Sequence, residues 1–303
     1  MKALEIKNLE KIYWNTKVLK WIDLDIQEGD FFWLLWHNWA WKTTIIGILT
    51  GLVEKNGWNI SVFWCDIEKD KKQAKSFLWV VPQEFNFNIF TKVKDVPVIQ
   101  AGFYWIDKNT AQKRTKDYLK KLGLWEKRNA EVRELSWWMK RRLMIVRALV
   151  HNPKLLILDE PTEWIDVELR KQMWEFIREL NSSWTTILLT SHYLEEVEAL
   201  CNKVAIMSEW KIIENTYISD ILKKLDREVI VLNTKNEIKN ISSDFKKKYY
   251  GKILSLNEIE ICLWKKNTFN ELFEDISKEG IVVSSLRNKT SRLEQLFLDL
   301  TKK

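Results

Sequence analysis

Apolar runs and stretches of helical spacing alternate along the first part of the chain. Four apolar runs bounded by turn residues predict strands, at residues 4–9, 31–35, 155–158 and 186–190. The spacing of apolar residues predicts helices over residues 45–52 and 169–180. Strands that alternate with helices in this way favour an α/β fold, in which helices cover a mainly parallel sheet.

Two further segments depart from this alternation. Residues 110–149 have helical spacing and no clear strand, which predicts a helical subdomain inserted into the α/β body. After about residue 225, short apolar runs predict strands in REVIVLN, KILSL, IEICLW and GIVVSSL, and helical spacing returns at 269–277 and 291–300. We therefore expect one domain at residues 1–225 and a small α+β accessory domain at 226–303.

The composition excludes several classes of protein. With 46% hydrophobic residues the chain can bury a core, yet it lacks the roughly 18 consecutive apolar residues of a membrane-spanning helix and an N-terminal signal-peptide core. We expect a cytoplasmic protein that reaches a membrane only through a partner. The three cysteines are far apart and have no metal-binding spacing. The net charge of +7 forms no basic stripe, so nucleic acid is not an expected partner.

The first segment that carries chemistry is WHNWAWKTT, residues 36–44, which follows a predicted strand and opens a predicted helix. This is the context of the phosphate-binding loop G-x-x-x-x-G-K-[ST], in which Lys42 would reach the β- and γ-phosphates and the Thr43 hydroxyl would bind Mg²⁺. Both glycine positions of that pattern, 36 and 41, are tryptophan here, and so is position 39. Taken alone, W-x-x-x-x-W-K-T is no motif, and a helix start with a surface lysine would be the preferred interpretation.

The second segment is KLLILDEPTEWID, residues 154–166, an apolar strand that ends in two carboxylates. At the end of a buried strand, Asp159 could hold Mg²⁺ through water, and Glu160 could orient or deprotonate an attacking water. An Asp-Glu pair alone is common, whereas the whole string LLILDEPT is much more specific.

The third segment is LSWWMKRR, residues 135–142, which opens a helix. Met139, Leu143 and Val146 give that helix an apolar side, so Lys140, Arg141 and Arg142 are expected on its solvent-facing side. The start of the helix could face a phosphate.

Three single residues are weaker candidates. His192 follows a predicted strand and precedes an acidic helix, Gln83 follows another apolar run, and Tyr13 is an aromatic ahead of the phosphate loop that could stack on adenine. Each has an ordinary structural alternative, because a lone histidine, glutamine or tyrosine more often serves packing.

In order and spacing these six features resemble the nucleotide-binding subunits of ABC transporters over about residues 1–225. The strings VPQEFNFN and KRRLMIVRAL are similar to the ABC-2-type exporter ATPases, which often carry a C-terminal appendage. The resemblance implies a P-loop NTPase fold: an ABC nucleotide-binding domain with an inserted helical subdomain, plus a small C-terminal α+β appendage.

The resemblance also implies a role for each matching residue. The bound cofactors would be ATP and Mg²⁺, with Thr43, Gln83 and Asp159 at the metal. Glu160 would be the general base, His192 would contact the γ-phosphate, and Gln83 would sense Mg²⁺ and face the membrane subunit. The nucleotide-binding residues would be Tyr13, Trp36, His37, Asn38, Trp39, Ala40, Trp41, Lys42, Thr43, Thr44, Ser136, Trp137, Trp138 and Asp166.

The implied partners are a second nucleotide-binding subunit and a polytopic membrane permease. Ser136 and position 138 would cap ATP bound to the opposite subunit, so catalysis requires a dimer, expected to be a homodimer, at the inner face of the cell membrane. Two alternatives stay open: a soluble ABC ATPase of translation or DNA repair, and a protein unable to bind nucleotide, if the tryptophans are real. The transported substrate is not revealed.

The tryptophans depart systematically from the family pattern. They occupy motif glycines at 36, 39, 41, 137, 138 and 164, and turn or strand-end glycines at 21, 58, 64, 79, 184 and 210. The chain has 18 Trp and only 8 Gly, whereas about 7% glycine is usual. Exchanging all but Trp125 and Trp174 would bring the count to 24 glycines. We hypothesise that UGA codons meaning glycine were translated as tryptophan; positions 14, 33, 105 and 264 fit this less clearly.

Overall fold

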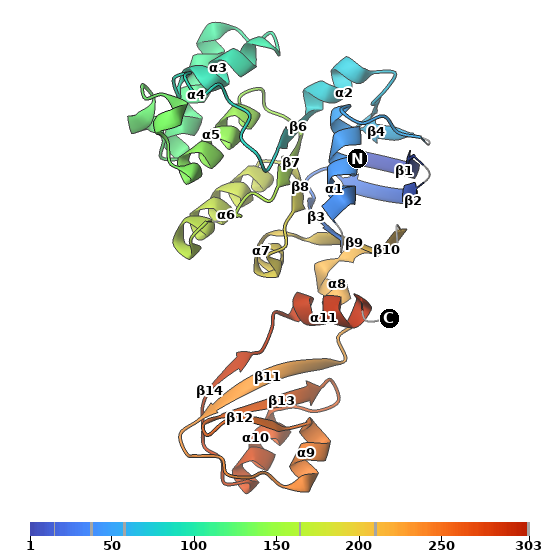
Figure 1. Cartoon of the computed structure of the whole chain (residues 1–303), viewed down its shortest axis with the longest axis vertical. Helices are drawn as coiled ribbons and strands as arrows, with labels where there is room; N and C mark the ends of the chain where they lie inside the picture. Colours follow the sequence, from blue (N-terminus) through green and yellow to red (C-terminus); the bar gives the residue numbers. More distant parts are fainter. Residues whose placement is uncertain (15, 37–38, 57–58, 164, 209–210, 302–303) are drawn as a thin grey trace. The chain divides into compact units, whose positions relative to one another are not determined.

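The computed structural model describes residues 1–14, 16–36, 39–56, 59–163, 165–208 and 211–301, and gives only the backbone of 36, 39–41 and 298–301. The chain forms two compact units, Met1–Thr216 and Tyr217–Lys303 (Figure 1). The division precedes the expected boundary at 225/226, because α8 (Ile218–Leu222) packs with α11 (Arg292–Thr301) in the second unit.

An antiparallel sheet of order β2-β1-β4-β5 opens the first unit. Its strands are β1 (Lys2–Tyr13), β2 (Thr16–Gln27), β4 (Ile60–Val62) and β5 (Cys65–Asp66). The predicted strand at residues 4–9 lies inside β1, whose apolar residues Leu4, Ile6 and Leu9 are fully buried in the core. The sequence did not predict an antiparallel sheet here.

The second sheet has the order β10-β9-β3-β8-β7-β6 and confirms the predicted parallel core. Its strands are β3 (Phe31–Trp36), β6 (Leu78–Val81), β7 (Leu155–Asp159), β8 (Thr186–Thr190), β9 (Lys203–Ser208) and β10 (Lys211–Tyr217). The pairs β3–β8, β3–β9, β6–β7 and β7–β8 are parallel. Strands of such sheets are buried on both faces, which explains why β7 and β8 are continuous apolar runs.

Helices surround this sheet, as predicted. The helices that precede or follow its strands along the chain include α1 (Trp39–Thr50), α2 (Lys71–Phe77), α6 (Val167–Ser182) and α7 (Leu194–Leu200). The chain between β6 and β7 forms the predicted helical subdomain, with α3 (Asp95–Gly102), α4 (Lys108–Lys121), η1 (Trp125–Lys127), η2 (Val132–Glu134) and α5 (Trp137–Leu149). In Figure 1, α3, α4 and α5 form one group. Together, the sheets and helices of the first unit give the mixed α/β architecture expected of the P-loop class.

The second unit is a four-stranded antiparallel sheet of order β12-β13-β11-β14. Its elements are β11 (Arg227–Thr234), α9 (Ser243–Tyr249), β12 (Lys252–Ser255), β13 (Glu258–Trp264), α10 (Phe269–Lys278) and β14 (Val283–Asn288), besides α8 and α11. Ile230 and Ile261 of the sheet share a core with Phe245 of α9 and Leu272 of α10. In the described part of the chain, no helix is both long and apolar enough to cross a membrane.

Candidate functional site

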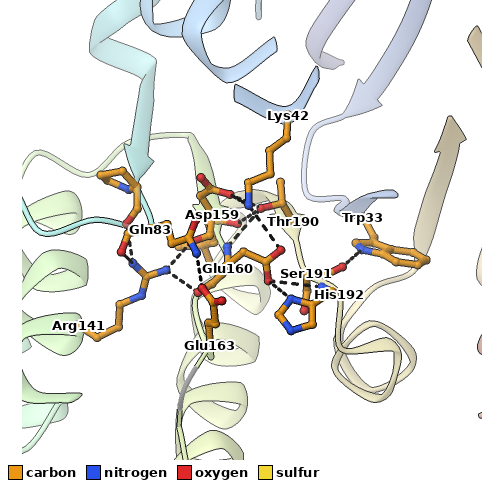
Figure 2. Close-up of polar contacts among 12 residues, drawn as sticks. Trp33, Lys42, Gln83, Arg141, Asp159, Glu160, Glu163, Thr190, Ser191 and His192 are labelled. Atoms are coloured by element: carbon orange, nitrogen blue, oxygen red, sulfur yellow. Dashed lines mark hydrogen bonds and ion pairs between the residues drawn. The ribbon is translucent and has the colours of Figure 1, made fainter. Parts of the chain in front are cut away.

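Side chains from separate segments converge where β7 and β8 end, beside the first turn of α1 (Figure 2). Lys42 comes from α1, Asp159 ends β7 and Glu160 follows it, while Thr190 ends β8 and His192 lies two residues beyond. Parallel strands present their carboxyl ends at one edge of a sheet, which is where such folds bind ligands. The sequence-predicted residues Lys42, Asp159, Glu160 and His192 are therefore brought together.

Lys42 is held by both carboxylates. Its Nζ lies 2.6 Å from Asp159 Oδ1 and 3.5 Å from Glu160 Oε1, and the side chain is only 3% exposed. A buried charge requires such compensation. A phosphate that bound Lys42 in place of Asp159 would leave the Asp159 carboxylate free to bind another cation.

Glu160 is buried and carries unusual backbone geometry. Its φ is +49°, a left-handed value, and its N–H donates to the Thr190 carbonyl at 3.0 Å. His192 Nδ1 lies 2.9 Å from Glu160 Oε2. Burial raises the pKa of Glu160, whereas Lys42 and His192 act to lower it. The result is a carboxylate more basic than usual, placed between Lys42 and His192.

Thr190 is a site residue that the sequence reasoning missed. Its hydroxyl donates to Asp159 Oδ1 at 2.6 Å, and it accepts from the Glu160 N–H at 3.2 Å. It thereby orients the Asp159 carboxylate and holds the backbone of Glu160. The available signal was a hydroxyl at the end of the strand TILLT, whose middle residues are apolar, immediately before Ser191 and His192.

Only part of the expected phosphate loop can be compared with the structure. His37 and Asn38 lie outside the described residues, as do Trp58, Trp164 and Trp210 and the side chains of Trp36, Trp39, Ala40 and Trp41. In the first turn of α1, Thr43 is exposed and Thr44 is buried.

The donor set fits Mg²⁺ shared with a nucleotide. Mg²⁺ is usually bound by one or two carboxylates together with substrate phosphates rather than by an all-protein cage. Asp159 supplies a carboxylate, and the exposed Thr43 supplies a hydroxyl near Lys42. Within the described ranges, no group of three or more His, Cys, Asp or Glu could hold a metal ion by itself.

Gln83 lies near the cluster but points to a different carboxylate. Its Nε2 donates to Glu163 Oε2, a partner that the sequence reasoning did not identify (Figure 2). Glu163 is 8% exposed and belongs to the EPTE string after β7. The role expected for Gln83 at Mg²⁺ stays a prediction.

The expectation that Arg141 faces solvent is wrong. Arg141 is completely buried, and its guanidinium donates to backbone carbonyls of the segments after β6 and β7. The helical period put Arg141 on the polar side of α5, but that side packs against these segments rather than against water. Lys140 and Arg142 are half-buried.

Ser136 and Asp166 each cap a helix. The Ser136 hydroxyl accepts from the Met139 N–H at 3.2 Å at the start of α5, and the Asp166 carboxylate accepts from the Leu169 N–H at 3.0 Å at the start of α6. Such residues satisfy free N–H groups of the first turn. The bonds lie within their own helices, so their expected roles toward nucleotide stay predictions.

The aromatic candidates are partly exposed. Tyr13, 39% exposed at the end of β1, has Lys11 Nζ 4.9 Å from its ring centroid. Trp137 lies edge-on to the Phe85 ring at 5.5 Å, and Arg142 lies 4.6 Å from the Trp138 ring. The Trp138 indole N–H is buried without a hydrogen-bond partner among the described residues.

Several tryptophans occupy backbone geometry that suits glycine. Trp14, Trp21, Trp105 and Trp184 have φ of +54°, +57°, +57° and +67°. Their side chains are mostly exposed, from 59% at Trp21 to 99% at Trp14. A left-handed conformation costs a residue other than glycine about 1–2 kcal/mol.

Three other tryptophans have well-formed contacts. Trp174 Nε1 donates to Glu196 Oε1 at 3.0 Å, and Trp33 Nε1 donates to the Ser191 carbonyl at 3.1 Å. The ring of Trp125 is surrounded by cations, with the Arg128 guanidinium 4.6 Å from its centroid. Tryptophan suits these three positions.

Comparison with known proteins gives consistent matches. The family model described as ABC transporter matches residues 19–163. The linearmycin resistance ATP-binding protein LnrL of Bacillus subtilis (strain 168) is 30% identical, over 98% of each chain. The Nod factor export ATP-binding protein I of Cupriavidus pinatubonensis is 36% identical over 67% of this chain and 63% of its own. A solved ATP-binding subunit of an ABC transporter, 23% identical, superposes with a TM-score of 0.68 over 73% of this chain and 92% of its own, which shows a shared fold.

Proposed function

Because the chain belongs to the ABC transporter family of ATP-binding subunits, which are ATPases coupled to transport, we propose that it powers an ABC-2-type exporter. Two relatives have export or resistance in their names. One of them, LnrL, matches this chain over both of its compact units. The strings VPQEFNFN and KRRLMIVRAL support the ABC-2 group.

The observation that carries the catalytic part of this proposal is the cluster of Lys42, Asp159, Glu160 and His192. ATP phosphates would bind at the start of α1 and draw Lys42 away from Asp159, which would then hold Mg²⁺ together with Thr43 and Gln83. When bound, Mg²⁺ neutralises charge on the phosphates. Glu160 would accept a proton from the attacking water, as its burial favours, and His192 would contact the γ-phosphate.

The remaining nucleotide contacts would come from the end of β1 and from the starts of helices. Tyr13 would stack on adenine, and the loop before α1 would wrap the phosphates with its N–H groups. Ser136, with positions 137 and 138, would cap ATP bound to a second subunit, and Asp166 would complete the nucleotide-binding set. Hydrolysis would therefore occur in a homodimer, held at the inner face of the cell membrane by a polytopic permease.

We further propose that the native protein carries glycine at most positions written here as tryptophan, because its gene reads UGA as glycine. Four tryptophans with left-handed backbone support this, two of them at positions 14 and 105 that the sequence pattern left less clear. A phosphate loop that approaches its ligand with backbone N–H groups leaves no room for an indole at 36, 39 or 41. The contacts of Trp33 and Trp174 instead support real tryptophan at those two positions.

A crosslinking experiment tests the partner. The chain is co-expressed with the product of a neighbouring gene that encodes about six apolar spans, with a photoreactive residue at Phe90, which is 64% exposed in the segment after Gln83. The matched control places the same residue at Leu52, which is 86% exposed and lies two residues after the end of α1. We expect crosslinks to the permease from position 90 and not from 52. Crosslinks to ribosomes or DNA would contradict the exporter.

A further inference from the structure

Arg141 binds the backbone that carries the catalytic carboxylates. Its Nη2 donates to the carbonyl of Asp159 at 2.5 Å and to that of Glu160 at 2.7 Å, and its Nε donates to the Pro161 carbonyl at 3.2 Å. Three consecutive peptide groups after β7 are thus fixed by one planar guanidinium. Such a rigid fork of donors is a property of arginine that lysine lacks.

The same guanidinium also binds the segment that carries Gln83. Its Nη1 donates to the Pro82 carbonyl at 2.5 Å and lies 3.4 Å from the Gln83 carbonyl. Figure 2 shows Arg141 between the Gln83 segment and the Glu160–Glu163 segment, within the network that includes the Gln83–Glu163 hydrogen bond. Arg141 therefore joins two loops of the site to helix α5.

The charge of Arg141 is retained in the interior. The side chain is 0% exposed, and burial lowers its pKa to about 10, while Asp159, Glu163 and Glu160 act to raise it. It is still protonated at neutral pH. Its hydrogen bonds named above all go to backbone carbonyls, so the positive charge also attracts the nearby carboxylates.

Helix α5 begins at the other functional segment of the chain. Ser136 caps α5 and Arg141 lies five residues further along the same helix. If Ser136 contacts ATP on the opposite subunit, as the proposed function holds, α5 begins at the partner's nucleotide. Five residues later it carries Arg141, which holds the backbone of this subunit's general base, Glu160.

We propose that Arg141 is a positioning residue for ATP hydrolysis: it locks the backbone of Gln83 and of Asp159–Pro161 to α5, and so couples the two ATP sites of the dimer. This inference rests on the proposed function. Arg141 touches no nucleotide itself. It sets where Glu160 and Gln83 stand when ATP bound to the partner subunit arrives at Ser136.

The chain offers a matched control on the same helix. Arg147 is also buried, at 9% exposure, and its Nη2 donates to Asn86 Oδ1 at 2.5 Å. It binds the chain beyond Gln83, and none of its hydrogen bonds described here goes to the carboxylate segment. Arg147→Met thus removes a buried arginine from α5 without releasing Glu160.

The test compares Arg141→Met, Arg141→Lys and Arg147→Met. The parent is the form of the full chain that hydrolyses ATP, either as written or with glycine at 36, 39, 41, 137 and 138. We expect kcat to fall about 100-fold in Arg141→Met, the usual effect of about 1 Å of misplacement, with affinity for a non-hydrolysable ATP analogue within about threefold of the parent. Arg141→Lys should be intermediate, and Arg147→Met should keep kcat.

The split between kcat and nucleotide affinity separates positioning from simple structural support. A structural defect in the loops would weaken binding of the non-hydrolysable analogue together with kcat, whereas misplacement of Glu160 lowers kcat alone. Partial recovery of kcat in Arg141→Lys, whose ammonium keeps some of the donors to the backbone carbonyls, would point the same way.

Each outcome decides the inference. A hydrolysing parent whose Arg141→Met variant keeps kcat within about twofold would overturn it. Equal losses of kcat in Arg141→Met and Arg147→Met would also overturn it, and so would a loss of analogue affinity in Arg141→Met as large as its loss of kcat. Should Arg141→Met not fold, Arg141→Lys decides: kcat below that of Arg147→Lys supports the inference, and equal kcat overturns it. A parent that hydrolyses no ATP in either form would overturn the proposed function, and this inference with it.

Discussion

Replacing Trp14, Trp21, Trp105 and Trp184 with glycine is expected to stabilise the protein. Each has a left-handed backbone, which costs tryptophan about 1–2 kcal/mol and glycine almost nothing. Glycine also makes the unfolded chain more flexible, which offsets about 0.4–1 kcal/mol of that gain. The net stabilisation is then about 0.5–1 kcal/mol at each position.

Exposure decides where this gain is largest. Trp14 and Trp105 are 99% and 87% exposed, so their removal sacrifices almost no buried apolar area. Trp21 is 59% exposed, and the indole of Trp184 packs so closely over Gly29 that a Cβ at Gly29 would lie 3.4 Å from it, so both should gain less. Because separated sites usually add, the four changes together should raise the free energy of unfolding by about 2 kcal/mol.

The assay is equilibrium unfolding in urea, followed by far-UV circular dichroism, of the chain as written and of the four-glycine form. The matched control is Trp174→Gly. Trp174 lies inside α6 and donates to Glu196, so glycine there loses this bond and about 1 kcal/mol of helix propensity. We expect a higher midpoint for the four-glycine form and a lower one for the control. If the urea midpoint of the four-glycine form is lower than that of the chain as written, as for Trp174→Gly, the reasoning is refuted.

Four further outcomes concern the site. Glu160→Gln should leave ATP binding intact, nearly abolish hydrolysis and trap a nucleotide-bound dimer; unchanged turnover would remove Glu160 from its role. Lys42→Ala should instead weaken ATP binding itself, measured by titration, because it deletes a charge-assisted phosphate contact. Because burial raises the pKa of Glu160 and the base must be ionised, kcat should fall with decreasing pH already above the ordinary glutamate value of about 4.3. Since His192 lowers that pKa, His192→Ala should move the fall to higher pH, and a profile that stays in place would contradict the pairing.

The parallel core and the carboxylate cluster were predictable from the sequence. The short apolar runs of β7 and β8 predict buried strands, and parallel strands end at one edge. That rule alone places Asp159 near His192, and the phosphate-loop pattern adds Lys42. The first sheet was less visible, because register shifts between β1 and β2 interrupt the alternation of apolar and polar residues.

Arg141 and Glu163 mark the limit of such reasoning. Helical spacing assigns Arg141 to the polar side of α5, and nothing in the pattern says that backbone carbonyls of two other segments lie there. The contact between Gln83 and Glu163 joins residues far apart in sequence, neither of which is unusual in its own string. Tertiary packing decides both, so only the structure reveals them.

A working phosphate loop requires glycine where tryptophan is written at 36, 39 and 41. The most direct test is therefore to identify the residues of the native protein at these positions. Trypsin releases residues 21–42 as one peptide, written with tryptophan at 21, 33, 36, 39 and 41, and residues 172–178 as another, which contains Trp174. Mass spectrometry of protein from its own source should find glycine at 36, 39 and 41 and tryptophan at 174. Native peptides with tryptophan at 36 and 41 would contradict the account.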